Sequence, residues 1–294
     1  MSDAVIYDRG YRAYEGELSG RRGARRAIVR DGVRRVLGLR RKARRKVLPW
    51  GLLALGVIMA AVFIGLQFVA GSIAAAASEG LPSYPELFDV YSRVSLLFLA
   101  VTMPELLGPD RRQGVLSVYF SRPLTVTDYL AAKGVAYVLM ASSIYLVPQV
   151  AFHLGQAALS SDGFLAYLTG NLDVLWFILV STLAFVAVHG GVLAIISAHV
   201  DRTPFAAATF LGVLIAGNNL TEAISQASFS GARWVSMLAL DAHARYVRDW
   251  VFGVDLETYP QEAAGFEPWT SVVAIALVAI LGAVWTHRRY RRLA

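Results

Sequence analysis

The sequence predicts an all-α polytopic membrane protein with six transmembrane helices and both termini in the cytosol. Of its 294 residues, 56% are hydrophobic, and the mean hydropathy is +0.51. A soluble domain is roughly half apolar at most and could not bury the surplus. Two further observations complete the prediction: six apolar segments of membrane-spanning length, and a bias of Lys and Arg toward one side of them.

The apolar segments define a transmembrane domain over residues 47–287. A helix needs roughly 20 apolar residues to cross the hydrocarbon, so the longest segment is expected to tilt or project. The first segment begins too late for a cleaved secretory signal, and none is expected. The predicted spans cover residues 47–70, 91–107, 134–159, 172–200, 205–224 and 270–287.

The distribution of basic residues predicts the orientation. Fifteen of the 28 Lys and Arg residues lie in residues 1–46, and four each lie in 108–133 and in the tail 288–294. The loops 71–91 and 160–171 carry none. Basic loops stay in the cytosol, so both termini and the 108–133 stretch are predicted there, in a cell inner (plasma) membrane. The loop 225–269 is then extracytoplasmic, with amphipathic pieces that could form re-entrant helices.

The N-terminal segment 1–46 is predicted to contain a basic amphipathic helix in the membrane interface. Its aliphatic residues recur at helical spacing, and arginines occupy the remaining circumference. The alternative is a disordered basic tail. A basic segment beside a span favours contact with anionic membrane lipids, and no nucleic-acid partner is expected. The arginines assigned to this helix are Arg25, Arg26, Arg30, Arg34 and Arg35.

The stretch 108–133 has the strongest local signature. Gly108-Pro109 is expected to end the preceding helix, and a short helical pattern follows before Arg122-Pro123 interrupts it. Thr125 and Thr127 can cap a new helix, with Asp128 in its first turn. The stretch is therefore predicted to be a short helix, a turn and the start of the third span.

Polar residues inside spans are costly and are candidates for function. Each also has a structural interpretation, because an interhelical hydrogen bond or an interface contact can retain such a residue. His189 precedes two glycines, which indicates close helix packing. The candidate pathway or interhelical residues are Glu105, Gln149, His153, His189, Asn218 and Glu222.

Motifs for other chemistry are absent from the sequence. There is no Cys, no metal-ligand spacing of His and Glu, no Gly-x-Ser-x-Gly elbow and no Walker A loop. The chain is therefore not expected to be an enzyme or to bind a cofactor. If ATP powers it, ATP and Mg²⁺ are expected on a partner subunit.

The layout of spans resembles the permease (transmembrane) subunit of type-2 ABC transporters, specifically bacterial ABC exporters. The resemblance also rests on local motifs. They are Gly114-Val115-Leu116, Ser121-Arg122-Pro123-Leu124, Tyr129-Leu130-Ala131-Ala132-Lys133, and the N-terminal runs 6–12 and 46–50. The family usually has glutamates before the glycine, whereas Asp110-Arg111-Arg112-Gln113 stand here.

The resemblance implies a cytosolic coupling helix at 109–121 that docks on a separate ATPase subunit, present in two copies. It also implies a second permease chain, identical or homologous, and an amphipathic or lipid-like substrate or drug. The implied coupling residues are Arg111, Arg112, Gly114, Leu116, Tyr119, Phe120, Arg122 and Pro123.

Two other classes remain as alternatives. An ion- or proton-coupled secondary carrier would use Glu105, His153, His189 or Glu222, although the six spans show no clear inverted repeat. An integral membrane enzyme would need a cluster of catalytic residues near one interface, and the sequence shows none.

Overall fold

The computed structural model describes residues 20–39, 42–73, 83–121, 124–225 and 231–293, and over these ranges the protein is helical without a strand. Six of the described helices are long and apolar enough to cross a membrane. They are α2 (Arg44–Ile73), α3 (Tyr84–Arg112), α5 (Val126–Leu159), α7 (Leu172–His199), α8 (Thr203–Ser225) and α12 (Pro268–Arg291). The structure therefore has the multi-pass helical architecture that the sequence predicts.

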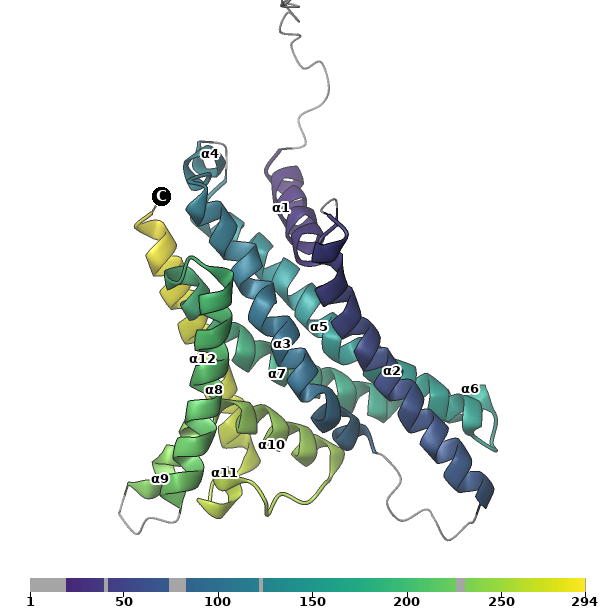
Figure 1. Cartoon of the computed structure of the whole chain (residues 1–294). Coiled ribbons are helices and arrows are strands. Elements are labelled where there is room, and N and C mark those ends of the chain that lie inside the picture. Colours follow the sequence, from purple (N-terminus) through teal and green to yellow (C-terminus); the bar gives the residue numbers. More distant parts are fainter. Residues whose placement is uncertain (1–19, 40–41, 74–82, 122–123, 226–230, 294) are drawn as a thin grey trace, which may run out of the picture.

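The helices form a bundle with two different ends (Figure 1). Helix α1 (Gly20–Val36), the short α4 (Leu116–Phe120) and the C-terminal turn of α12 lie at one end, which we call the basic end. At the opposite, far end lie α6 (Phe164–Gly170), α9 (Ala232–Val235) and α11 (Pro260–Ala263). The segment 160–171, expected to be a loop, thus contains a helix.

Helix α7 is the centre of the bundle, whereas α2 and α8 lie at its surface. In the most apolar window of α7, 61% of residues are buried, against 11% for α2 and 17% for α8. Helices α3, α5, α8 and α12 all pack on α7. The exposed sides of α2 and α8 can therefore contact lipid or another chain.

Helix α3 is longer than the predicted span 91–107 at both ends. It begins after Ser83, which forms a reciprocal capping box with Glu86. It continues through Gly108 and Pro109 to Arg112, so the predicted break at that pair is wrong. A tertiary contact offers the reason: Asp110, one residue on, is held by Arg35 of α1 and Lys133 of α5, which favours the helical last turn.

Helix α5 begins where the sequence indicates. The Thr125 hydroxyl accepts from the Asp128 backbone N–H, and the Asp128 carboxylate accepts from the Thr125 N–H at 3.0 Å. This capping box confirms the predicted helix start, although the helix extends before the predicted span 134–159. The connection from α4 to α5 is therefore short.

The segment between α8 and α12 packs at the far end of the bundle. It contains α9, the 3₁₀ turn η2 (Ser236–Leu238), α10 (Leu240–Phe252) and α11. Helix α10 packs on α7 and α12 with a buried face that includes polar residues. The predicted amphipathic pieces of 225–269 are thus helical where the structure describes them, and whether they re-enter the membrane stays a prediction.

Candidate functional site

Helix α4 stands at the basic end between α3 and α5, but its aromatic residues face inward. The Tyr119 and Phe120 rings lie 5.6 and 6.1 Å from the ring of Tyr129 on α5. Leu116 is 6% exposed. Leu116, Tyr119 and Phe120, three of the coupling residues that the resemblance implies, therefore attach α4 to its own bundle. Their contact with a partner stays a prediction.

The outward surface of α4 consists of other residues. Val118 is 59% exposed, and Ser117 beside it is also exposed. Arg112 and Gly114 precede them and are exposed, with Gly114 at φ +65° in the turn between α3 and α4. The predicted coupling residues Arg122 and Pro123 lie outside the described residues. We call Arg112, Gln113, Gly114, Ser117 and Val118 the α4 surface.

A buried ion network lies directly behind α4. Asp110 of α3 accepts from Arg35 of α1 at 2.7 Å and from the Tyr129 hydroxyl at 2.9 Å. Lys133 of α5 completes the network, with its ammonium 2.7 Å from Asp110 Oδ2. Asp110 and Lys133 are each 1% exposed. Because one carboxylate joins α1, α3 and α5, these three helices are tied together at the base of α4.

Arg111 points in another direction, toward the turn between α7 and α8. Its guanidinium lies 2.6 Å from Asp201 and donates to the carbonyls of Ser197 and Ala198. Arg111, one of the coupling residues that the resemblance implies, thus joins α3 to the end of α7. Its contact with a partner stays a prediction.

Helix α1 packs against protein through the face that was expected to meet lipid. Ile28, Gly32 and Val36 are buried, and a Cβ on Gly32 would lie 2.8 Å from Ala136 Cβ of α5. Arg35 faces the same bundle through Asp110, and burial, which lowers its pKa, is outweighed by Asp110 and Asp31, so the pKa is raised. The described residues confirm a basic helix here but seat it on α3 and α5.

The exposed arginines of α1 divide into two groups. Arg21 donates to Asp128 at 2.6 Å, and Arg25 bonds the other oxygen of the same carboxylate. Arg26 and Arg30 are exposed, while Arg34 is half-buried. Two of the basic residues thus fix α1 to the start of α5, and Arg26 and Arg30 are directed toward solvent or headgroups.

The predicted intramembrane polar residues do not form one cluster. Glu105 lies toward the basic end and lines a cavity of about 800 Å³ between α1, α2, α3 and α8, which Arg35 and Arg112 also line. At the far end, Gln149 donates to the Tyr84 carbonyl at 3.1 Å, and His153 bonds the Tyr84 hydroxyl at 2.8 Å. Their i, i+4 spacing was predicted to make an interhelical bond, and the structure confirms it.

His189 and the pair Asn218 and Glu222 have separate surroundings. His189 Nε2 lies 3.1 Å from Asp241 of α10 and Nδ1 lies 3.5 Å from the Tyr145 hydroxyl. Asn218 is half-buried and Glu222 exposed on the outer part of α8, where Thr221 donates to the Val235 carbonyl at 3.0 Å. That part of α8 packs on α9 and η2.

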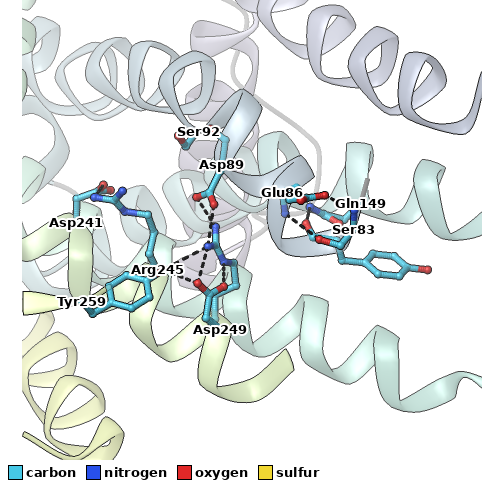
Figure 2. A network of polar contacts seen from close by, with 11 residues as sticks. Ser83, Glu86, Asp89, Ser92, Gln149, Asp241, Arg245, Asp249 and Tyr259 are labelled. Carbon is cyan, nitrogen blue, oxygen red and sulfur yellow. Dashed lines mark hydrogen bonds and ion pairs between the residues drawn. The ribbon is translucent and has the colours of Figure 1, made fainter. Parts of the chain in front are cut away.

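The largest charge network at the far end was not predicted (Figure 2). Arg248 of α10 bonds both oxygens of Asp89 on α3, at 2.6 and 3.0 Å, and both oxygens of Asp249, at 2.6 and 3.0 Å. Tyr259 donates to Asp249 at 2.5 Å. Asp89 and Arg248 are 159 residues apart, and no local pattern in the sequence indicates the pairing.

Electrostatics keep this far-end network charged. Burial lowers the pKa of Arg248, but hydrogen bonds to Asp249 and Asp89 outweigh it and raise that pKa. Burial raises the pKa of Asp241, but the hydrogen bond with His189 and nearby arginines lower it overall. The network therefore acts as a charged latch that holds α10 against α3 and α7.

We expect Asp89→Ala to loosen α10 without unfolding the bundle. The Asp89 side chain is 49% exposed, so its loss should cost about 1 kcal/mol or less. Hydrogen exchange of peptides from α10 should accelerate several-fold, because local opening becomes easier. Asp255→Ala, in the loop after α10, is the control and should leave exchange unchanged. Equal protection of α10 in both variants would contradict the latch.

The described residues contain no group of three or more potential metal ligands. No protein-family model matches the chain, and the search of curated proteins found no match either. The functional argument therefore rests on the arrangement at the two ends of the bundle.

Proposed function

We propose that this chain is the transmembrane permease subunit of an ATP-driven exporter and receives the work of ATP hydrolysis through α4. The observation that carries the proposal is the attachment of α4. This short helix presents the α4 surface at the basic end, and its inner side is fixed by Leu116 and the Tyr129 contacts to the helices behind it.

Such an attachment suits the transfer of a rigid-body movement. A partner that displaced α4 would pull on α3 and α5 together, because Asp110 and Lys133 join them in the buried network. Arg111 would extend the movement to the turn between α7 and α8. Packed helices shift as units rather than deform, so a displacement at α4 would reach the whole bundle.

The proposed orientation places the basic end in the cytosol. The positive-inside bias supports it, since α1 and the exposed Arg288, Arg289 and Arg291 of α12 lie at that end. A separate ATPase subunit, in two copies, would bind there with its own ATP and Mg²⁺. The membrane would be the plasma membrane, and the reaction efflux of a substrate or drug.

The proposed substrate is amphipathic or lipid-like. The cavity of about 800 Å³ near Glu105 supports this class, because apolar residues such as Leu48, Leu52 and Phe98 line it beside two arginines. This cavity lies between α1, α2, α3 and α8. The open faces of α2 and α8 would accept a second permease chain, as a homodimer or with a homologue.

Single-cysteine chemistry tests this function, because the chain has no native cysteine. We expect Val118→Cys, on the α4 surface, to react with a membrane-impermeant maleimide only after cells are opened. Val254→Cys, an exposed valine after α10 at the far end, is the matched control and should react in intact cells. The reverse labelling pattern would place the basic end outside the cell and would contradict the proposal.

The same variant reports the partner. A short bifunctional reagent should cross-link the Val118→Cys variant to a protein that hydrolyses ATP. In a separate co-purification, the charged variant Val118→Glu should reduce recovery of that ATPase by about tenfold, as expected for a central interface residue. A control Val→Glu change at Val254 should leave recovery unchanged. Efflux that persists in vesicles without ATP would contradict ATP coupling.

A proton-coupled carrier is the alternative, and the buried pair of His189 and Asp241 is the observation that favours it. A carrier of this kind would need no ATPase. Neutralising either residue would abolish transport driven by a pH gradient, whereas Val118→Glu would leave it intact.

A further inference from the structure

We infer that the protein holds an anionic phospholipid in a cavity between α3, α5, α7 and α12. This cavity measures about 600 Å³, within the roughly 300–1,000 Å³ of small-molecule sites. It is distinct from the cavity beside Glu105, because the two share no lining residue. The inference does not rest on the proposed transport function.

The wall of the cavity is suited to an acyl chain. Small residues of α7 and α12 form much of it, including Gly190, Ala194 and Ala279. Val138 of α5 and Leu183 of α7 line it too and are 43% and 47% exposed, so the cavity opens toward lipid. Burial of an acyl chain in such a site is favourable from water but gains little from lipid, which is equally apolar, so the chain alone gives no selectivity.

Selectivity would come from the polar groups, which lie toward the basic end of the cavity. Thr127 at the start of α5 and His287 near the end of α12 bond each other at 3.1 Å. Thr286 is buried beside them, and its hydroxyl has no hydrogen-bond partner among the described residues. Buried hydroxyls normally find a partner, so this one has the capacity to donate to a ligand.

Lys133, which also lines the cavity, supplies a second group with donors to spare. Its ammonium is paired with Asp110, and beyond that ion pair the described residues offer it no hydrogen-bond acceptor. An ammonium has three N–H donors, so donors remain for a phosphate or ester oxygen. The Thr286 hydroxyl lacks an acceptor and the Lys133 ammonium has only Asp110, so both have donors left for a ligand rich in oxygen.

The surrounding charge favours an anion. Asp110, Asp128 and Asp201 at this end are each paired with an arginine. The turns that follow Thr286 carry exposed arginines at 288, 289 and 291, at the level where lipid headgroups lie. A phosphodiester with an attached acyl chain meets both requirements, whereas free phosphate would leave the apolar wall uncovered.

Phosphatidylglycerol tests the inference against phosphatidylcholine with the same acyl chains. We expect the purified, delipidated protein to show a larger rise in melting temperature with phosphatidylglycerol. Ala283→Trp, which fills the cavity from α12, should abolish that difference. Ala276→Trp is the control: it is an exposed alanine two turns away on α12 and does not line the cavity. If Ala283→Trp does not fold, Ala131→Trp narrows the cavity from α5.

The headgroup contact has its own variant. Thr286→Val should weaken binding of phosphatidylglycerol by about tenfold, the loss expected for one hydrogen bond to a charged group. Thr182→Val removes another buried, unpartnered hydroxyl, on α7, that does not line the cavity, and should leave affinity unchanged. The inference is overturned if Ala283→Trp behaves like Ala276→Trp, if both lipids bind equally, or if inorganic phosphate alone reproduces the shift.

Discussion

Replacing Asp110 with asparagine should destabilise the protein by about 3–5 kcal/mol, the cost of leaving a buried charge without its partner. Lys133 is the charge left behind, since its ammonium pairs with Asp110 Oδ2 at 2.7 Å and is 1% exposed. Arg35 is less affected because Asp31 also pairs with it at 2.7 Å. Thermal unfolding in a mild detergent should show the loss as a markedly lower melting temperature.

Asp201→Asn is the matched control. Asp201 lies at the same end and also pairs with an arginine, but its side chain is 59% exposed, so its removal should cost about 1 kcal/mol or less. A double variant, Asp110→Asn with Lys133→Met, should recover part of the lost stability because it removes the orphaned ammonium. Equal melting temperatures for the two single asparagine variants, with no higher melting temperature for the double variant, would show that the network does not stabilise the protein.

Substituting alanine for Gly191 should separate α7 from α12 and cost about 1–3 kcal/mol, the range for overpacking. A Cβ on Gly191 would lie 2.4 Å from the Val278 carbonyl oxygen. On the facing helix, a Cβ on Gly282 would lie 2.4 Å from the Gly191 carbonyl oxygen. Both obstacles are backbone atoms, so neither helix can yield without moving as a whole. Gly282→Ala should therefore resemble Gly191→Ala.

The comparison variant is Gly212→Ala on α8, where a Cβ would meet nothing within 4 Å. Alanine is favoured over glycine in a helix by up to about 1 kcal/mol, so this change should stabilise the protein. Gly191→Ala should therefore lower the melting temperature, whereas Gly212→Ala should raise it. Combining Gly191→Ala with Gly282→Ala should cost less than the sum, because the first change already opens the crossing. Additive effects, or a stable Gly191→Ala, would contradict the close approach.

Local signals in the sequence predicted the features that depend on neighbouring residues. The start of α5 followed from Thr125 and Asp128, three residues apart in a capping box. The bond between Gln149, His153 and α3 followed from their i, i+4 spacing on one helix face. The glycines after His189 predicted a close helix approach, which Gly191 makes with α12.

Another prediction failed because a long-range contact outweighed local preference. Pro109 should have ended α3, but the buried Asp110 network lies in the turn around it. The inward packing of α4 was not predicted either: Leu116 is buried and Tyr119 packs on Tyr129 of α5, while docking of α4 on a partner stays a prediction. A hydrophobic residue on a short helix has no local property that tells whether its partner is inside or outside the chain.

The sequence by itself determined that the chain forms long apolar helices able to cross a membrane, and the positions of most of them. Lipid offers no hydrogen bonds to the backbone, so an apolar segment of that length has to satisfy its own as a helix. Only the tertiary structure decided which polar groups meet. Arg35 and Asp110 are 75 residues apart, and Arg248 and Asp89 are 159 apart. Such pairs exist because the packing of whole helices brings them within hydrogen-bonding distance, and hydropathy carries no information about that packing.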